Sequence, residues 1–375
     1  MPSTTTLGVI DRGKPFIYPG FPRTASRLEG GAQGMSQAAR ANSGISSTPD
    51  PELAIKEWRL KALADIWTGD ANRRGDTFVP TGLMGSLRWW FEVLVRGLGG
   101  KACDPTKDGV RCPTKGKQPH ELEHRCVVCE LFGCTGWSRK FRLMAMAENG
   151  FPIGQQIKAG QTFVLRFVPL RPIRDEEWCL LNATLRLIAN YGAVGGKTVL
   201  KPSDEPNRRN APHHKDYGLV SIVEDPKLPC CSLEKVKAYV RNPRWRTAFK
   251  DDSFSWAALS NFWFVEGRHL ARLSIQKSTF NKVIGRHEPK SGSEHLHHNN
   301  DVNKWLAGDR QKSKKVFSFA LSEKGTRTFG FVKPGLVDFA EMEKRLKEVW
   351  PSLGEVEFQI GERLLEKLFR SCSAE

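Results

Sequence analysis

The order of hydrophobic patterns between residues 55 and 223 restricts the fold of this chain more than any other feature. Alternation of apolar and polar residues, the pattern of a half-buried strand, occurs over residues 58–66, 141–147 and 163–167, and residues 217–223 are predicted to form a further strand. Helical periodicity occurs over residues 86–98 and about 174–191, where Gly192 stands at the position of a helix C-cap. This order predicts a ferredoxin-like α+β unit, in which two helices cover one face of an antiparallel sheet.

The rest of the chain divides around this unit. Residues 1–52 are rich in Ser, Thr, Gly, Pro and Ala and lack periodicity, which predicts a disordered N-terminal arm. We assign residues 53–225 to a first domain, with a polar insertion at 99–140. Residues 226–375 predict a second α+β domain, which we interpret as a degenerate copy of the first, although no repeat is detectable in the sequence. Its strands and helices are expected near residues 316–321, 326–332, 337–349 and 361–371.

The helix at residues 86–98 opens with a pattern that suits phosphate binding. Ser86 is the predicted N-cap, and Gly82 and Gly85 leave the entering backbone without side chains. A helix N-terminus presents unpaired amides and a partial positive charge. One interpretation is a phosphate seat flanked by Arg88, and the other is an ordinary core helix after a glycine turn.

Five of the nine cysteines lie between residues 103 and 134. Cys126-Val-Val-Cys129 places two thiols on one tight turn, a common half of a tetrahedral zinc site, and we assign the other half to Cys103 and Cys112. Because protein would then fill all four positions, the zinc ion would be structural. The alternatives are other ligands, free cysteines, or a catalytic zinc assisted by Glu130. The competing ligands are His120, His124 and Cys134.

A second glycine-rich segment is strongly basic. It begins with Gly192, Gly195, Gly196 and Lys197 and continues through Lys201, Arg208, Arg209, His213, His214 and Lys215 to Gly218. Glycines allow a backbone to approach a phosphate chain closely, and lysines and arginines neutralise it. The spacing is not that of a Walker loop, and the segment follows a helix instead of a strand. It is either a phosphate-binding loop beside the helix at 86–98 or a solvated loop.

The charge balance predicts a polyanionic partner. The chain of 375 residues carries a net charge of +17, with a pI of about 9.6. Its mean hydropathy is −0.44, and no apolar run approaches the roughly 20 residues needed to span a bilayer. No signal-peptide pattern opens the sequence. An odd cysteine count with a C-x-x-C pair suits a reducing compartment better than a disulfide framework, so we expect a cytoplasmic protein that binds nucleic acid.

Two motifs resemble those of a known family. The first is Pro80-Thr-Gly-Leu-Met-Gly-Ser-Leu-Arg-Trp-Trp90, which resembles a G-x-L-R-W-W signature. The second is Cys126-Val-Val-Cys-Glu-Leu-Phe-Gly133, which is similar to a C-x-x-C-x-L-F-G motif. With the glycine-rich loop from Gly192, they resemble the RAMP superfamily of CRISPR proteins, and within it the first subunits of Cmr (type III-B) effector complexes. The resemblance covers residues 55–225 well and the C-terminal half weakly.

The resemblance implies two tandem ferredoxin-like (RRM-like, βαββαβ) domains with a zinc-binding insertion in the first. It implies a non-catalytic RNA-binding subunit for antiviral defence, near the 3′ end of a guide RNA, that helps bind single-stranded target RNA alongside other Cmr subunits. By match it places metal ligands at Cys126 and Cys129. It places RNA contacts at Gly85, Arg88, Gly192, Gly195, Gly196 and Lys197, to which we add Arg139, Lys140, Arg208 and Arg209. The loop runs longer to Gly218 than is usual in relatives.

An endoribonuclease that cleaves guide-precursor or target RNA is the alternative function. Related subunits cut RNA with a loop aspartate and a metal ion, and Asp70 and Asp76 lie in the comparable loop. His213 and His214 are candidates for acid–base work on RNA. For all four residues, an ordinary solvated or phosphate-facing role is the competing interpretation. A scaffold that contacts only protein is a third function.

Overall fold

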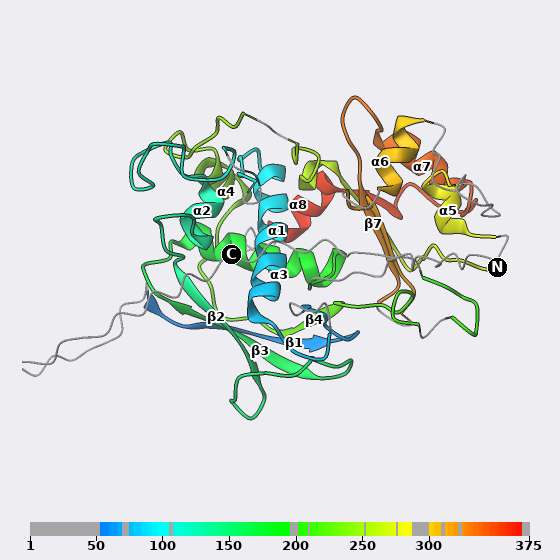
Figure 1. Cartoon of the computed structure of the whole chain (residues 1–375), viewed down its shortest axis with the longest axis horizontal. Coiled ribbons are helices and arrows are strands. Elements are labelled where there is room, and N and C mark those ends of the chain that lie inside the picture. The colour runs from blue at the N-terminus through cyan, green and yellow to red at the C-terminus, as the bar shows by residue number, and fades with distance from the viewer. Residues whose placement is uncertain are drawn as a thin grey trace, which may run out of the picture.

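A computed structural model gives the architecture of the chain (Figure 1). It describes residues 53–69, 75–104, 107, 109–195, 202–208, 211–250, 253–274, 277–286, 300–308, 312–321 and 325–369. The predicted arm at residues 1–52 lies outside this part of the chain. The described residues form two four-stranded antiparallel sheets with helices between and beside them. None of the described helices combines the length and the apolar character that a membrane span requires.

The first sheet has the predicted ferredoxin-like topology. Its elements in chain order are β1 (Lys56–Ala62), α1 (Pro80–Gly97), α2 (Val127–Phe132), β2 (Phe141–Ala147), β3 (Thr162–Pro169), α3 (Asp175–Tyr191) and β4 (Val220–Glu224). The strands lie in the order β2-β3-β1-β4. In the register, Trp58 pairs with Leu165, and Leu143 pairs with Phe167. These four side chains are buried on the face that α1 and α3 cover, as the alternation predicted.

Helix α1 begins six residues before the predicted N-cap, so the assignment of Ser86 as N-cap is wrong. Pro80 occupies the first turn, where a missing N–H costs nothing. The preceding residue, Val79, donates its N–H to Oγ1 of Thr68 at 2.7 Å. Gly82 packs against the backbone of Thr68, since a Cβ there would lie 2.5 Å from its carbonyl oxygen. Gly85 therefore lies inside the helix and not at its entrance.

The second sheet repeats the topology of the first. Its unit contains η2 (Leu259–Asn261), β5 (Phe262–Glu266), α5 (Thr279–Val283), α6 (Asp301–Ala307), β6 (Val316–Phe319), β7 (Arg327–Phe331), α7 (Phe339–Lys347), β8 (Phe358–Ile360) and α8 (Gly361–Phe369). The strand order is β6-β7-β5-β8, which matches β2-β3-β1-β4 position for position. The second α+β unit is thus a ferredoxin-like copy of the first, as expected.

The second sheet is covered on both faces. Phe262 and Phe329 join the core that contains α1 and α3, and the ring of Trp90 lies 5.9 Å from that of Phe329. On the opposite face, Trp263 packs in a separate core with Met342 of α7. The layers therefore run from the first sheet through α1 and α3 to the second sheet and then to α5, α6 and α7 (Figure 1). Helix α1 is buried between the two sheets.

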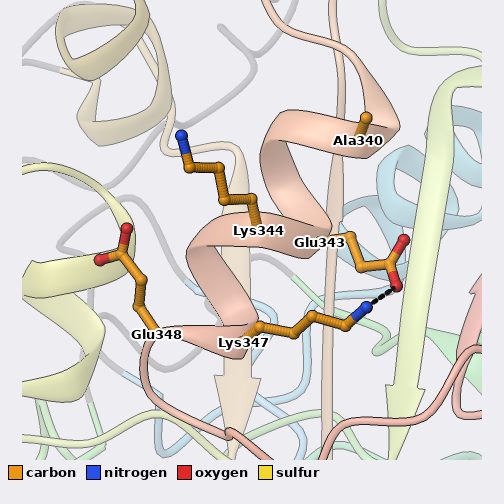
Figure 2. Close-up of a pocket in the computed structure, with 5 residues that line it drawn as sticks. All are labelled: Ala340, Glu343, Lys344, Lys347 and Glu348. Atoms are coloured by element: carbon orange, nitrogen blue, oxygen red, sulfur yellow. Dashed lines mark ion pairs between the residues drawn. The ribbon is translucent and has the colours of Figure 1, made fainter.

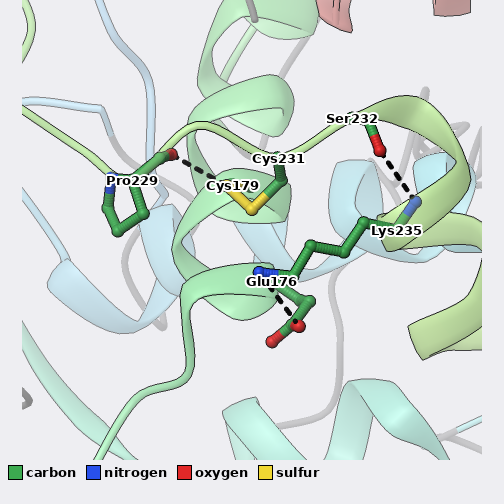
Figure 3. The surroundings of a disulfide bond; sticks show 6 residues. All are labelled: Glu176, Cys179, Pro229, Cys231, Ser232 and Lys235. Atoms are coloured by element: carbon green, nitrogen blue, oxygen red, sulfur yellow. Dashed lines mark hydrogen bonds and ion pairs between the residues drawn. A yellow bond between two sulfur atoms is a disulfide. The ribbon is translucent and has the colours of Figure 1, made fainter.

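A disulfide joins the segment after the first sheet to α3. Cys179 on α3 bonds to Cys231, which lies just before α4 (Leu233–Val240), as Figure 3 shows. The N-cap Ser232 accepts a hydrogen bond from the backbone N–H of Lys235, whose side chain reaches Glu176 at 3.5 Å. The sequence separates these two cysteines by 52 residues, and the interpretation that the cysteines suit a reducing compartment better than a disulfide framework did not anticipate this bond.

Candidate metal centre and nucleic-acid interface

The four cysteines assigned to a metal converge in the structure. The sulfur atoms of Cys103, Cys112, Cys126 and Cys129 all lie within 4.8 Å of one another, and all four residues are buried. Cys126 and Cys129 come from the start of α2, whereas the other two come from the loop after α1. The backbone N–H of Cys126 donates to Sγ of Cys112 at 3.3 Å. The set contains neither of the competing ligands His124 and Cys134.

The cluster fits a tetrahedral metal ion. With metal–sulfur bonds of about 2.3 Å, the sulfur atoms of a zinc tetrathiolate lie about 3.8 Å apart. The Sγ atoms of Cys103 and Cys129 are 3.4 Å apart, close to that spacing. Burial opposes ionisation of Cys126, but hydrogen bonds from the other three thiols outweigh it and lower the pKa of Cys126. The donor set and its geometry thus suit a divalent thiophilic metal with no open coordination position.

Two arginines from different parts of the chain contact this cluster, Arg88 half-buried and Arg246 buried. Arg88 of α1 donates to Sγ of Cys129 at 3.3 Å, and Arg246 lies 3.9 Å from Sγ of Cys112. Four thiolates around a divalent ion carry a net charge of −2, which two guanidinium groups offset. Burial opposes the charged form of Arg88, but Cys129 and Glu92 outweigh it and raise the pKa of Arg88. Sequence analysis did not identify Arg246 as part of this site, because it follows Cys112 by 134 residues.

The guanidinium of Arg88 is engaged by partners within the protein, and 16% of its side chain is exposed. It donates to Glu92 Oε1 at 2.9 Å and to the carbonyl of Gly133 at 3.1 Å. Glu92 is 3% exposed and also pairs with Arg96, which donates to the carbonyl of Ala257 ahead of the second sheet. The placement of Arg88 at an RNA-facing helix entrance is therefore corrected: this side chain connects α1 to the cysteine cluster.

The start of the glycine-rich loop lies directly beside α1. The N–H of Gly195 donates to Oγ of Ser86 at 3.0 Å, which gives Ser86 a role that sequence analysis missed. Gly195 has φ = +109°, and a Cβ on it would lie 2.7 Å from the carbonyl oxygen of Trp67. Gly85, one residue before Ser86, has open space around its Cβ position. The two glycine segments therefore converge, as the sequence predicted.

Two other predicted RNA contacts are buried structural residues. Lys140 pairs with Glu130 at 2.9 Å and with Glu177 at 2.9 Å, and its side chain is 7% exposed. Gly192 packs under Trp90, because a Cβ there would lie 2.5 Å from the indole ring. These contacts leave neither residue available to a phosphate chain, so their predicted placement is corrected as well.

The remaining predicted RNA contacts either are at least partly exposed or lie outside the described part of the chain. Arg139 is exposed at the start of β2, and Arg208 is half-buried 3.5 Å from Glu205. The residues that fall outside the described ranges are Gly196, Lys197 and Arg209, together with Asp70 of the catalytic alternative. Asp76, the other loop aspartate, is exposed, and its backbone carbonyl accepts from the N–H of Gln156 at 3.0 Å.

The two histidines of the catalytic alternative lie side by side. The rings of His213 and His214 are 4.1 Å apart; the first is exposed and the second buried. Nearby, Asp216 accepts a hydrogen bond from the N–H of Ala320 at 2.9 Å, so the loop docks on the second unit. Burial raises the pKa of Asp216 to about 6. This part of the loop is therefore held by packing against β6.

Two hollows on the described surface have linings of different character. One lies over α7 and is lined by alternating charges, with Lys347 paired to Glu343 at 2.7 Å (Figure 2). An ion pair at this helical spacing is typical of a solvated helix face. The other hollow, of about 530 Å³, lies between the β1–α1 loop and the β2–β3 connection and contains Trp67 and Asp76. Sequence analysis did not identify this second hollow, because its walls come from two separate loops.

Comparisons with known proteins relate part of the chain to a family. A family model described as RAMP superfamily matches residues 59–200, which contain α1, the cysteine motif and the start of the glycine-rich loop. No curated protein matches the sequence. Cmr1 from Pyrococcus furiosus (apo form) is similar with 11% identity and a TM-score of 0.38, covering 85% of this chain and 96% of that one.

Two further solved structures are similar at comparable identity. A chain of the type III-B Cmr-beta bound to cognate target RNA has 10% identity and a TM-score of 0.41, and the match covers 79% of this chain and 99% of that one. A chain of the Csm3-Csm4 subcomplex of the type III-A CRISPR-Cas interference complex has 13% identity and a TM-score of 0.23, covering 50% and 93%. The signature helix and the cysteine motif both lie within residues 59–200, the part of the chain that matches the RAMP superfamily.

Proposed function

We propose that this protein is a non-catalytic RNA-binding subunit of a type III-B (Cmr) CRISPR effector complex. In this proposal it lies near the 3′ end of the guide RNA and helps bind single-stranded target RNA, with other Cmr subunits as partners. The observation that carries the proposal is the hydrogen bond between Gly195 and Ser86, because it joins the glycine-rich loop to α1 beside the open Gly85. A ribose–phosphate strand needs such a surface, on which backbone amides are not screened by side chains.

The charge of the chain supports RNA over a protein-only scaffold. A net charge of +17 attracts a polyanion over distances longer than any single contact. The loop that contains Gly195 adds Arg208 and Lys215 among its described residues. The resemblance of the Leu87–Trp90 signature to that of Cmr first subunits supports the assignment to this complex.

We further propose that the cysteine cluster holds a structural zinc ion. Four buried thiols fill a tetrahedral site and leave no position for a reacting water. The ion would fix the insertion against α1 through Arg88, without taking part in chemistry on RNA. Metal analysis of the purified protein should find one zinc ion per chain, and a different metal or none would overturn this assignment.

RNA binding is tested by titrating a labelled single-stranded RNA at several salt concentrations. Affinity should fall steeply with salt, because binding to phosphates releases counterions. Gly85→Glu should weaken binding at least tenfold without unfolding, since a Cβ at Gly85 meets no atom within 4 Å and the carboxylate would repel phosphates. The matched control is Ala340→Glu, which adds the same charge on exposed α7 in the layer beyond the second sheet. Equal affinity of the two variants would refute the proposed surface.

The same RNA tests whether the protein is an enzyme. Incubation of labelled RNA with the protein and Mg²⁺ should leave the RNA intact. Cleavage that disappears in Asp76→Ala, or in a variant with alanine at both His213 and His214, would establish the endoribonuclease instead. Cleavage that persists in these variants would indicate a contaminating nuclease, which repeated purification should remove.

A further inference from the structure

The hollow beside Trp67 has the form of a ligand pocket. Its volume of about 530 Å³ falls in the range of roughly 300–1,000 Å³ that is typical of small-molecule sites. The polar and aromatic residues that line it are Trp67, Asp76, Gln155, Gln156, Lys158 and Gln161. An aromatic ring, a carboxylate, three carboxamides and an ammonium group in one hollow are a set that can bind the edge of a planar heterocycle.

Backbone hydrogen bonds hold the two walls of this pocket together. The N–H of Ile66 donates to the carbonyl of Ile157 at 2.9 Å, and the N–H of Phe78 donates to the carbonyl of Gly154 at 3.1 Å. Trp67 is held in place by Tyr217, whose ring lies 5.3 Å away, and by Gly75, where a Cβ would overlap the indole at 2.4 Å. The pocket is therefore preformed by the fold, which reduces the entropy lost when a ligand binds.

The polar groups of the pocket are already partly oriented. Lys158 donates from Nζ to Oε1 of Gln156 at 2.5 Å and from its backbone N–H to Oε1 of Gln161 at 2.6 Å. With both oxygens engaged, each carboxamide has its NH₂ group to offer as a donor. The exposed carboxylate of Asp76 supplies an acceptor with two oxygens. The pocket thus combines donors on one segment with a two-oxygen acceptor on the other.

From this combination we propose that the pocket binds one unpaired guanine base. Guanine presents O6 and N7 as acceptors and its N1–H and 2-amino group as adjacent donors. The carboxamide NH₂ groups match the acceptors, and a carboxylate such as that of Asp76 accepts from the two donors together. Adenine and cytosine lack this pair of adjacent donors, and uracil has only one ring N–H.

The position of the pocket connects it to the proposed RNA surface, and in this respect the inference rests on the proposed function. Trp67 lies between the pocket and the glycine-rich loop, because its carbonyl oxygen packs against Gly195. A strand whose phosphates pass Gly195 would bring a base within reach of Trp67. The same guanine chemistry is present in a free nucleotide, and the experiment distinguishes the two sources.

The test measures affinity for uridine decamers that carry one central guanine, adenine or cytosine, and for guanosine monophosphate, at 150 mM salt. The guanine decamer should bind about tenfold more tightly than the other two. Asp76→Ala should reduce this preference to less than threefold, and Gly75→Ala should reduce it by displacing Trp67. Glu355→Ala, which removes another exposed acid, should keep the preference. Thermal unfolding of each variant shows whether it is folded.

The outcomes separate this inference from the proposed function. If RNA binding depends on salt but shows no guanine preference, or if Asp76→Ala retains the preference, the proposed guanine pocket is refuted. The proposed RNA-binding function is not affected by either result. Absence of RNA binding, together with guanosine monophosphate binding that Asp76→Ala abolishes, would support a free-nucleotide pocket and refute the RNA-binding function. Absence of both would refute both.

Discussion

Replacement of Arg88 distinguishes the structural interpretation of α1 from the one based on sequence. The sequence-based view places Arg88 against RNA and expects Arg88→Ala to lower RNA affinity while the fold stays intact. In the structure, Arg88 is half-buried and donates to Glu92, to the carbonyl of Gly133 and to the sulfur of Cys129. We therefore expect Arg88→Met, which keeps the aliphatic volume, to destabilise the fold and weaken metal retention.

The loss of stability expected for Arg88→Met follows from the groups that lose their hydrogen-bond donor. Glu92 is 3% exposed and would keep only Arg96, at 3.6 Å. Breaking a buried ion pair by removing one partner costs about 3–5 kcal/mol, and the unpaired carbonyl of Gly133 adds about 1 kcal/mol. A loss of about 4 kcal/mol lowers the melting temperature of a protein of this size by roughly 10 °C.

The assay combines thermal unfolding, metal release to a chromogenic chelator and RNA titration. The double variant Arg88→Met/Glu92→Gln should recover about half of the lost stability, because it removes the uncompensated carboxylate. It should not recover metal retention, since Cys129 still lacks its donor. If Arg88→Met kept its melting temperature and its metal but bound RNA at least tenfold more weakly, the structural reasoning would be refuted.

Three further changes test other parts of the structure. Asp216→Asn should remove a pH dependence. Because burial raises the folded pKa of Asp216 from 3.8 to about 6, the folded state keeps a proton that the unfolded state releases, and the wild-type protein should lose about 2 kcal/mol relative to the variant as pH rises from 4 to 6, measured by urea unfolding. Cys126→Ser should abolish metal binding and expose the insertion to limited proteolysis, and a full metal complement in this variant would contradict the assigned ligand set. Cys231→Ser should lower the free energy of unfolding by about 4 kcal/mol, the value for a loop closed over 52 residues. Dithiothreitol should lower the stability of the wild-type protein by the same amount and leave the stability of the variant unchanged.

Most of the first sheet could be predicted because apolar and polar residues alternate along parts of its strands. The predicted strand at 141–147 coincides with β2, where buried and exposed residues alternate over its first half. The start of α1 could not be predicted, because Pro80 and two glycines resemble a turn until Thr68 is seen to accept from Val79. The helices α5 and α6 have five and seven residues, too short for periodicity to show. Packing partners that are distant in the sequence could not be predicted either.

The site could be predicted only where its residues lie close together in the sequence. Cys126 and Cys129 lie three residues apart, so their spacing alone indicated a metal. Lys140 illustrates the opposite case, because its sequence neighbours are basic and its partner Glu177 lies 37 residues away. A basic residue near a glycine loop therefore resembles a phosphate contact until its carboxylate partner is located. The convergence of Gly195 on α1 was predicted because a ferredoxin-like sheet directs both segments to one side.

The contacts of α1 explain why its signature contains a serine, an arginine and a tryptophan within five residues. Ser86 holds the glycine-rich loop, Arg88 holds the cysteine cluster, and Trp90 packs against the second sheet and donates to the carbonyl of Ala193 at 2.8 Å. Because these residues share less than two turns of one rigid helix, displacement of one contact strains the others. Loss of the metal would leave Arg88 without its thiolate partner and allow the first turns of α1 to shift relative to Gly195. Removal of the metal by a chelator should therefore weaken RNA binding although no cysteine touches RNA, and an apo protein with unchanged RNA affinity would show that the helix does not couple the two sites.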